Sequence, residues 1–99
     1  MTKTEEISFI LGARRRYNVL KILLEGDYTA KEISELSLIS YQYVLKKLQE
    51  LYEHQLVTHN NAKRGRIYSI TPLGSSVAKE VMIRNRAIYG SSNNGINRR

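Results

Sequence analysis

The hydrophobic pattern of the chain changes its period near residue 55, and this change limits the fold more than any other feature. As far as His54, apolar residues recur at the three- and four-residue spacing of amphipathic helices. After Gln55 come two short β-branched runs, residues 56–59 and 66–70, which are typical of strands. The segment 60–65 between them has the composition of a turn, so a hairpin is predicted. The expected fold class is α+β, mostly α.

The N-terminal part is predicted to be helical from Thr4 to Leu24. Thr4 precedes two carboxylates, which are favourable at the N-terminal end of a helix. Gly12 weakens this helix by roughly 1 kcal/mol relative to Ala, so a kink or a split is expected there. Gly26 is expected to end the helix in the left-handed conformation that glycine adopts most easily.

Two capping signals mark a pair of helices in the middle of the chain. Thr29 and Glu32 have the spacing of a capping box, and a helix of about two turns follows. After a three-residue break, Ser40 is a suitable N-cap for a second helix, from Tyr41 to about His54. The buried side of this second helix is a narrow apolar stripe formed by Val44, Leu48 and Leu51.

The last helix is predicted to begin at Thr71, with Pro72 in its first position, and to end at Gly90. Its apolar stripe is wider than one contact with a small domain requires, so we expect a second copy of the chain to pack there across a two-fold axis. A monomer that folds this face onto its own first helix is the alternative. The residues expected at the dimer interface are Ile10, Val77, Val81, Met82, Asn85, Ile88 and Tyr89.

The length of 99 residues leaves room for one domain. We expect residues 1–90 to form it, with a dimerisation helix over about 72–90, and residues 91–99 to be a disordered basic tail. The chain has no cysteine, which excludes a disulfide framework and a Cys-based zinc site. No apolar run approaches the length of a membrane span, so a cytoplasmic protein is expected.

The net charge of +7 favours a polyanionic partner, and its distribution is more informative than its size. Residues 36–49 and 54–79 contain no acidic residue, whereas the acids gather elsewhere. Such a separation suggests a molecule with one positive face. The alternative for any single Lys or Arg is an ordinary solvated surface charge.

The order of these motifs resembles the helix-turn-helix of MarR/ArsR-type winged-helix regulators. The resemblance is carried by Lys31–Leu36, Ile39–Val44 and Leu48–Leu51, and Gly65–Gly74 resembles the wing strand and next helix of MarR- and HxlR-like members. It implies a winged helix-turn-helix with an added C-terminal dimerisation helix. It also implies DNA binding and dimerisation through terminal helices.

Two positions depart from the pattern of these regulators. Leu38 stands in the helix-turn-helix break and Gln55 stands before the first wing strand, where glycine is usual. Either position is expected to require a positive φ, which Leu and Gln adopt only at a cost.

The N-terminal half of the helix after Ser40 is the predicted recognition helix, because its outer face carries no acid and its positive dipole end suits phosphates. Gln is able to pair with adenine, and Tyr and Lys with phosphates or bases. Plain packing of the tyrosines and solvation of the polar side chains are the alternatives. The expected major-groove residues are Ser40, Tyr41, Gln42, Tyr43, Lys46 and Lys47.

The basic hairpin is predicted to reach the minor groove, where arginine is favoured by the negative potential. Its expected contacts are Asn61, Lys63, Arg64 and Arg66. A further basic cluster, in which at least one member is expected to be solvated or paired with an acid, supplies candidate phosphate contacts: Arg14, Arg15 and Arg16.

No cofactor, metal or enzymatic activity is predicted. His54 and His59 lack a third convergent ligand, and no catalytic triad or phosphate-binding loop is present. We therefore predict a sequence-specific double-stranded DNA-binding regulator, a homodimeric repressor on a pseudo-palindromic operator. The alternatives are a winged-helix module for protein–protein contact and a non-specific chromatin or nucleic-acid-binding protein. The short chain leaves little room for a pocket that holds a small-molecule effector.

Overall fold

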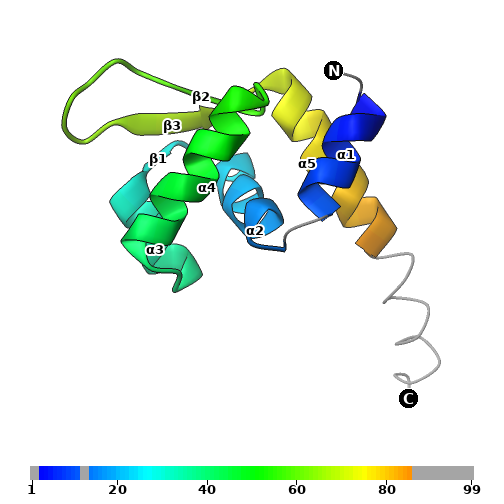
Figure 1. The fold of residues 1–99 in the computed structure, drawn as a ribbon, viewed down its shortest axis with the longest axis horizontal. Helices are drawn as coiled ribbons and strands as arrows, with labels where there is room; N and C mark the ends of the chain where they lie inside the picture. The colour runs from blue at the N-terminus through cyan, green and yellow to red at the C-terminus, as the bar shows by residue number, and fades with distance from the viewer. Residues whose placement is uncertain (1–2, 12–13, 86–99) are drawn as a thin grey trace.

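The computed structural model describes residues 3–11 and 14–85, which form five helices and three short strands (Figure 1). In chain order these are α1 (Lys3–Leu11), α2 (Arg14–Leu24), β1 (Tyr28–Thr29), α3 (Ala30–Ser37), α4 (Tyr41–Glu53), β2 (Val57–His59), β3 (Ile67–Ile70) and α5 (Pro72–Asn85).

The strands form one antiparallel sheet in the order β1-β3-β2. The predicted hairpin is confirmed: β2 and β3 pair with Val57 opposite Ile70 and His59 opposite Tyr68. The hairpin loop extends away from the helices (Figure 1). Strand β1 was not predicted, because two residues are too few to show an alternating pattern. It pairs with β3 and thereby ties the base of the hairpin to the start of α3.

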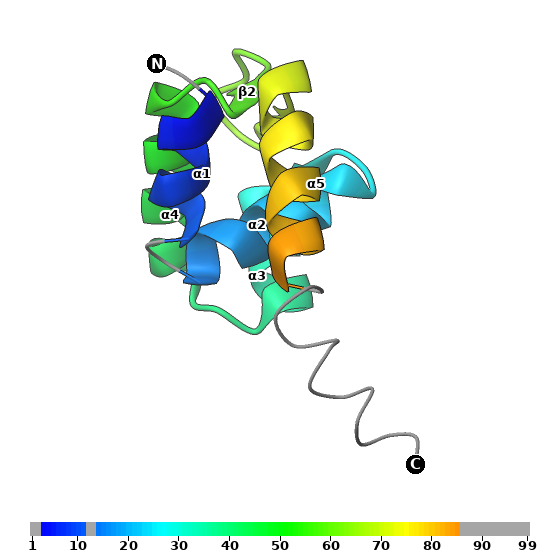
Figure 2. The same cartoon turned by 90° about the vertical axis from the view of Figure 1, so that its right-hand side faces the viewer.

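The helices enclose one apolar core. Helix α2 contacts α1, α3, α4 and α5, and α5 packs against α1 (Figure 2). The predicted stripe of α4 is confirmed, since each of its three residues is fully buried. Residues without any exposed surface include Ile10, Leu20, Ile33, Val44, Leu48, Leu51, Leu56 and Val77.

The predicted caps form as expected. The Thr29 hydroxyl accepts from the Glu32 amide and the Glu32 carboxylate accepts from the Thr29 amide, which completes the capping box. The Ser40 hydroxyl accepts from the Tyr43 amide, and the Thr71 hydroxyl accepts from the Gly74 amide. The predicted kink or split at Gly12 lies outside the described residues, which include α1 up to Leu11 and α2 from Arg14.

The backbone at Leu38 and Gln55 confirms the predicted positive φ, with values of 60° and 62°. Gly26 differs from its prediction: among the described glycines only Gly65 has a positive φ. Helix α2 therefore ends without a left-handed glycine, and residues 25–27 connect it to β1.

Gly74 allows α5 to approach the base of the hairpin closely. A Cβ at this position would lie 2.0 Å from the carbonyl oxygen of Leu56. The same carbonyl accepts a hydrogen bond from the Thr71 amide at 3.1 Å. Any side chain at Gly74 would therefore separate α5 from the segment that leads into β2.

Several sequence predictions concern residues beyond the described part. The predicted contacts of Ile88 and Tyr89, the end of the last helix at Gly90 and the tail 91–99 lie outside it. The predicted domain boundary at residue 90 lies outside it as well.

Candidate nucleic-acid interface

The N-terminal half of α4 presents polar and basic side chains to solvent. Tyr41, Gln42 and Lys46 are exposed, and the first turn of the helix contains no acidic residue. Ser40, also exposed, uses its hydroxyl as the N-cap. Together these residues form a surface that combines hydrogen-bonding groups with one ammonium group.

Tyr43 lies at the edge of this surface and is half-buried. The guanidinium of Arg15 lies 4.8 Å from its ring centroid, and the ammonium of Lys47 lies 4.9 Å from it. Two cations at this distance from one ring are in the range of cation–π attraction. The phenol ring therefore links α4 to the exposed start of α2.

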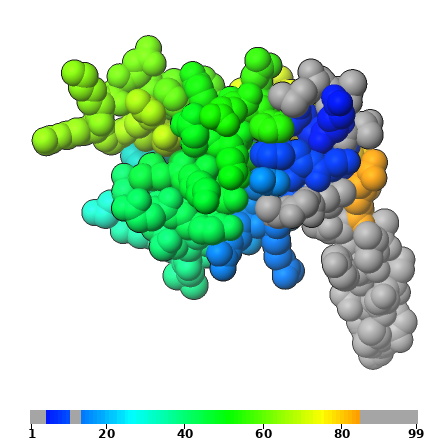
Figure 3. All heavy atoms as spheres, in the orientation of Figure 1, coloured from blue at the N-terminus to red at the C-terminus, as the bar shows by residue number. Residues whose placement is uncertain are grey.

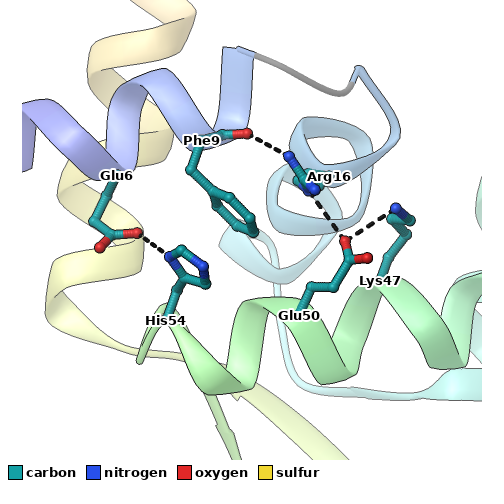
Figure 4. Close-up of polar contacts among 6 residues, drawn as sticks. All are labelled: Glu6, Phe9, Arg16, Lys47, Glu50 and His54. Atoms are coloured by element: carbon teal, nitrogen blue, oxygen red, sulfur yellow. Dashed lines mark hydrogen bonds and ion pairs between the residues drawn. The ribbon is translucent and has the colours of Figure 1, made fainter.

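Lys47 does not lie on the solvent-facing surface that the sequence predicted, whereas Arg16 pairs with an acid, an outcome expected for at least one member of its basic cluster. The Lys47 side chain is only 8% exposed, and its Nζ lies 2.9 Å from Glu50 Oε1. Arg16 donates to the same carboxylate oxygen at 3.1 Å and to the carbonyl of Phe9 at 2.8 Å (Figure 4). Considered alone, the helix has this flank open, but in the fold α1 and α2 cover it. Both cations are therefore paired with the half-buried carboxylate of Glu50.

These contacts change the titration of Glu50. Partial burial by itself raises the pKa of a carboxyl group, but hydrogen bonds from Lys47 and Arg16, and the charges of both, outweigh it. The net result is that the pKa of Glu50 lies below its ordinary value. Glu50 is consequently ionised and paired at neutral pH.

A stacked column joins α1 to the C-terminal end of α4 (Figure 4). The Phe9 ring lies between the guanidinium of Arg16, at 3.9 Å, and the ring of His54, whose centroid is 3.6 Å away. His54 Nδ1 lies 2.7 Å from the Oε1 of Glu6, a carboxylate with no exposed surface. The second oxygen of Glu6 has no hydrogen-bond partner in the described part of the chain. The sequence did not predict this pair, because 48 residues separate its members.

The hairpin loop carries the second basic group. Asn61, Lys63, Arg64 and Arg66 are all exposed, as predicted for a surface that meets a partner. The Arg66 Nε donates to the carbonyl of Ala62 at 3.3 Å, which orients its guanidinium along the loop. The hairpin segment projects from the rest of the molecule, at the left in Figure 3.

A groove of about 900 Å³ separates the hairpin loop from α3 and α4. Tyr41 and Leu45 of α4 form one wall, and the loop from Lys63 to Arg66 forms another. The groove is also lined by Lys31 at the start of α3, which was not among the predicted contact residues. Only the folded arrangement brings Lys31 beside the hairpin, more than 30 residues further along the chain.

Three residues predicted at a dimer interface are instead part of the core of the single chain. Ile10 and Val77 have no exposed surface and Val81 is 1% exposed. Because α5 packs against α1 and α2, these side chains are buried within one chain, as the monomeric alternative describes. On the described part of α5, Met82 is half-buried and Ile83 is 59% exposed.

Two kinds of feature are absent from residues 3–11 and 14–85. No group of three or more His, Asp or Glu side chains in these segments is placed to hold a metal ion. None of their helices has the length and apolar character needed to cross a membrane.

Solved structures match this fold over most of the chain. A mutant of ZitR from Lactococcus lactis in its apo form gives a TM-score of 0.77 at 24% identity, covering 100% of this chain and 84% of that one. The MarR family transcription regulator SP03579 gives 0.75 at 21% identity, covering 83% of this chain and 57% of its own. The homodimeric winged helix-turn-helix domain of Mb0332 from Mycobacterium bovis, a possible ArsR-family regulator, gives 0.70 at 18% identity over 93% and 83%. No family model and no curated protein matches the sequence.

The chain therefore has the winged helix-turn-helix fold, in which α3 and α4 form the helix-turn-helix and the β2–β3 hairpin is the wing. Its structural neighbours are winged-helix transcription regulators of the MarR and ArsR families, and none of those described above is an enzyme.

Proposed function

We propose that this chain is a transcription regulator that binds double-stranded DNA sequence-specifically. In this proposal α4 enters a major groove and the wing contacts the adjacent minor groove. A homodimer occupies a pseudo-palindromic operator and represses transcription by excluding other proteins from the site.

The observation that carries the proposal is a set of unpaired cations around one groove. No described carboxylate lies within ion-pair distance of any of them, although Glu35 lines the same groove. Unpaired cations beside a concave surface attract a polyanion, whereas cations of a merely solvated surface are usually interspersed with acids. Lys31, Lys63, Arg64 and Arg66 line this groove, and Lys46 lies on the exposed face of α4 outside its lining.

Base recognition is assigned to the exposed N-terminal half of α4. Gln42 is exposed and carries an amide that is able to pair with adenine N6 and N7. Tyr41 is 47% exposed and is suited to a phosphate or to the methyl group of thymine. Tyr43 and Arg15 are assigned to the phosphates at the edge of the groove. Lys47 and Arg16 are left out because each is bonded to Glu50.

Dimerisation is proposed through the surface formed by α1 and α5. The Mb0332 domain is homodimeric, and the exposed Ile83 gives α5 an apolar contact on its outer side. Met82, Asn85, Ile88 and Tyr89 are retained as proposed contacts, whereas Ile10, Val77 and Val81 are not, since they lie in the core. Two subunits would place their recognition helices about 34 Å apart, one turn of DNA.

Selection of binding sites from random DNA, followed by fluorescence anisotropy over a salt series, tests the proposal. For about six phosphate contacts, the logarithm of the association constant should fall with the logarithm of salt at a slope near −5. Lys63→Ala should weaken binding and reduce this slope by about 1. Lys21→Ala, an exposed lysine of α2 outside both proposed surfaces, is the matched control and should leave both unchanged.

Each alternative has its own outcome in this experiment. Equal affinity for the selected site and for a scrambled sequence would replace specific regulation by non-specific nucleic-acid binding. Absence of DNA binding at low salt would overturn the proposal and favour a winged helix that contacts an acidic protein.

A further inference from the structure

An aromatic contact joins the recognition helix to the wing. The rings of Tyr52 on α4 and His59 on β2 stack with centroids 4.5 Å apart and an interplanar angle of 23°. The His59 ring also meets the edge of Tyr68 on β3, at 5.3 Å and 72°. Tyr68 is buried, but Tyr52 is 43% exposed, so the outer member of this stack contributes little to the core.

The orientation of His59 is fixed from the side of the loop as well. Its Nδ1 lies 2.7 Å from the carbonyl oxygen of Asn60, and because a carbonyl only accepts, this nitrogen carries the hydrogen. The side-chain oxygen of Asn60 accepts from the amides of Ala62 and Ile67, at 3.4 and 3.1 Å. A continuous series of contacts thus runs from Tyr52 through His59 and Asn60 into the wing loop.

The stack lies on the same side of α4 as the groove. Tyr41, Leu45 and Tyr52 are separated by four and seven residues, and these spacings place them on one side of a helix. The first two line the wall of the groove that faces the wing. The stack therefore bridges α4 and the wing on the side of α4 that lines the groove.

We propose that Tyr52 is a positioning residue that holds the wing at a fixed distance and angle from α4. The inference rests on the proposed function, since it assigns to Tyr52 the spacing between major-groove and minor-groove contacts. Loss of the ring would leave the basic side chains of the wing in place but poorly oriented toward DNA.

The first test needs no DNA. Because the chain contains no cysteine, spin labels attach only at introduced sites, and Gln49→Cys on α4 with Lys63→Cys on the wing reports the separation. Tyr52→Ala should broaden or shift the distance distribution measured by pulsed electron paramagnetic resonance, whereas Tyr52→Phe should preserve it. Thr58→Ala, an exposed residue of β2, is the control. The same distribution in Tyr52→Ala and in the parent protein would overturn the proposal.

The second test measures coupling on the selected DNA site. Arg64→Ala should reduce affinity for the selected site about tenfold in the parent protein and in Tyr52→Phe. In Tyr52→Ala the same substitution should reduce it only about twofold. Equal losses in all three backgrounds would overturn the proposal. If Tyr52→Ala does not fold, Tyr52→Leu keeps apolar bulk without the ring and replaces it in both tests. Absence of DNA binding in the parent protein counts against the proposed function, while the distance measurement still decides the role of Tyr52.

Discussion

Leu38 occupies a left-handed backbone position although its side chain contributes no packing. Its φ is 60° and it is 92% exposed, so nothing in the fold offsets the unfavourable contact between Cβ and the backbone. Glycine at this position has no such contact, although it increases the entropy of the unfolded chain.

We therefore predict that Leu38→Gly raises the free energy of unfolding by about 0.5–1 kcal/mol. Chemical denaturation monitored by circular dichroism measures this change. Leu36→Gly is the matched control: Leu36 is also exposed but lies within α3, so glycine there should destabilise by about 1 kcal/mol. If both variants lose stability, the backbone of Leu38 is not strained in the way that its φ implies.

Glu50 is the residue whose contacts most directly predict a dependence on pH. Its pKa is lowered in the folded state relative to the ordinary value of 4.5, because Lys47 and Arg16 stabilise the ionised form despite the cost of burial. A lowered folded-state pKa contributes stability that is present above the unfolded pKa and is lost as pH falls through the folded pKa.

We predict that Glu50→Gln lowers the free energy of unfolding at pH 7 by about 1–2 kcal/mol, since it leaves Lys47 without its carboxylate. The difference between variant and parent should shrink below about pH 4.5, where the carboxylate becomes protonated. Urea denaturation at a series of pH values measures it. Glu53→Gln, on the exposed side of α4, should change stability at pH 7 by less than about 0.5 kcal/mol. A difference for Glu50→Gln that is constant from pH 7 to pH 3 would contradict the ion pairing.

At the scale of elements, the packing of α5 against the base of the wing depends on one glycine, Gly74. A Cβ at Gly74 would overlap the backbone carbonyl of Leu56, and backbone is unable to move aside as a flexible side chain would. Helix α5 would have to shift as a unit to relieve the overlap.

Gly74→Ala should therefore lower the free energy of unfolding by about 2 kcal/mol or more, as thermal and chemical denaturation would show. Gly26→Ala is the control, because its Cβ would lie 3.6 Å from the ring of Tyr28 and its φ is not positive. That substitution should change stability by less than about 0.5 kcal/mol. Equal effects at the two glycines would mean that α5 does not rest on the Leu56 carbonyl.

The elements that could be predicted from the sequence are those with local signals. The caps at Thr29, Ser40 and Thr71 each depend on residues within one helical turn, and the structure contains all three. The positive φ at Leu38 followed from a comparison with the helix-turn-helix pattern. The left-handed conformation predicted for Gly26 was wrong, because glycine permits that conformation without requiring it.

The candidate site was less predictable, because its surface depends on packing between distant segments. Lys47 faces outward on an isolated helix, but α2 brings Arg16 over that flank, where the Phe9 carbonyl of α1 holds it, and the lysine becomes buried. The pairing of Glu6 with His54 has the same origin. A single sequence indicates which side chains carry charge, but their exposure follows from contacts between elements.

At the scale of the whole molecule, the proposed homodimer predicts a geometric dependence on operator spacing. Two recognition helices held by one dimer contact the same side of the duplex only if their half-sites are about 10 bp apart or a multiple of that. An insertion of about 5 bp turns one half-site to the opposite side, whereas about 10 bp restores the side but doubles the separation.

We predict that a 5-bp insertion between the selected half-sites reduces affinity to that of a single half-site, measured by fluorescence anisotropy at fixed salt. Ile83→Glu, which places a charge on the exposed side of α5, should weaken binding to the intact operator and leave binding to an isolated half-site unchanged. Lys21→Ala, an exposed residue of α2 outside both proposed surfaces, controls for the same one-unit change in net charge. Sedimentation analysis of Ile83→Glu should show a smaller dimer fraction at equal concentration. Equal affinity for the intact and the interrupted operator would mean that each chain binds DNA independently, and the dimer proposal would then fail while DNA recognition by α4 and the wing remained.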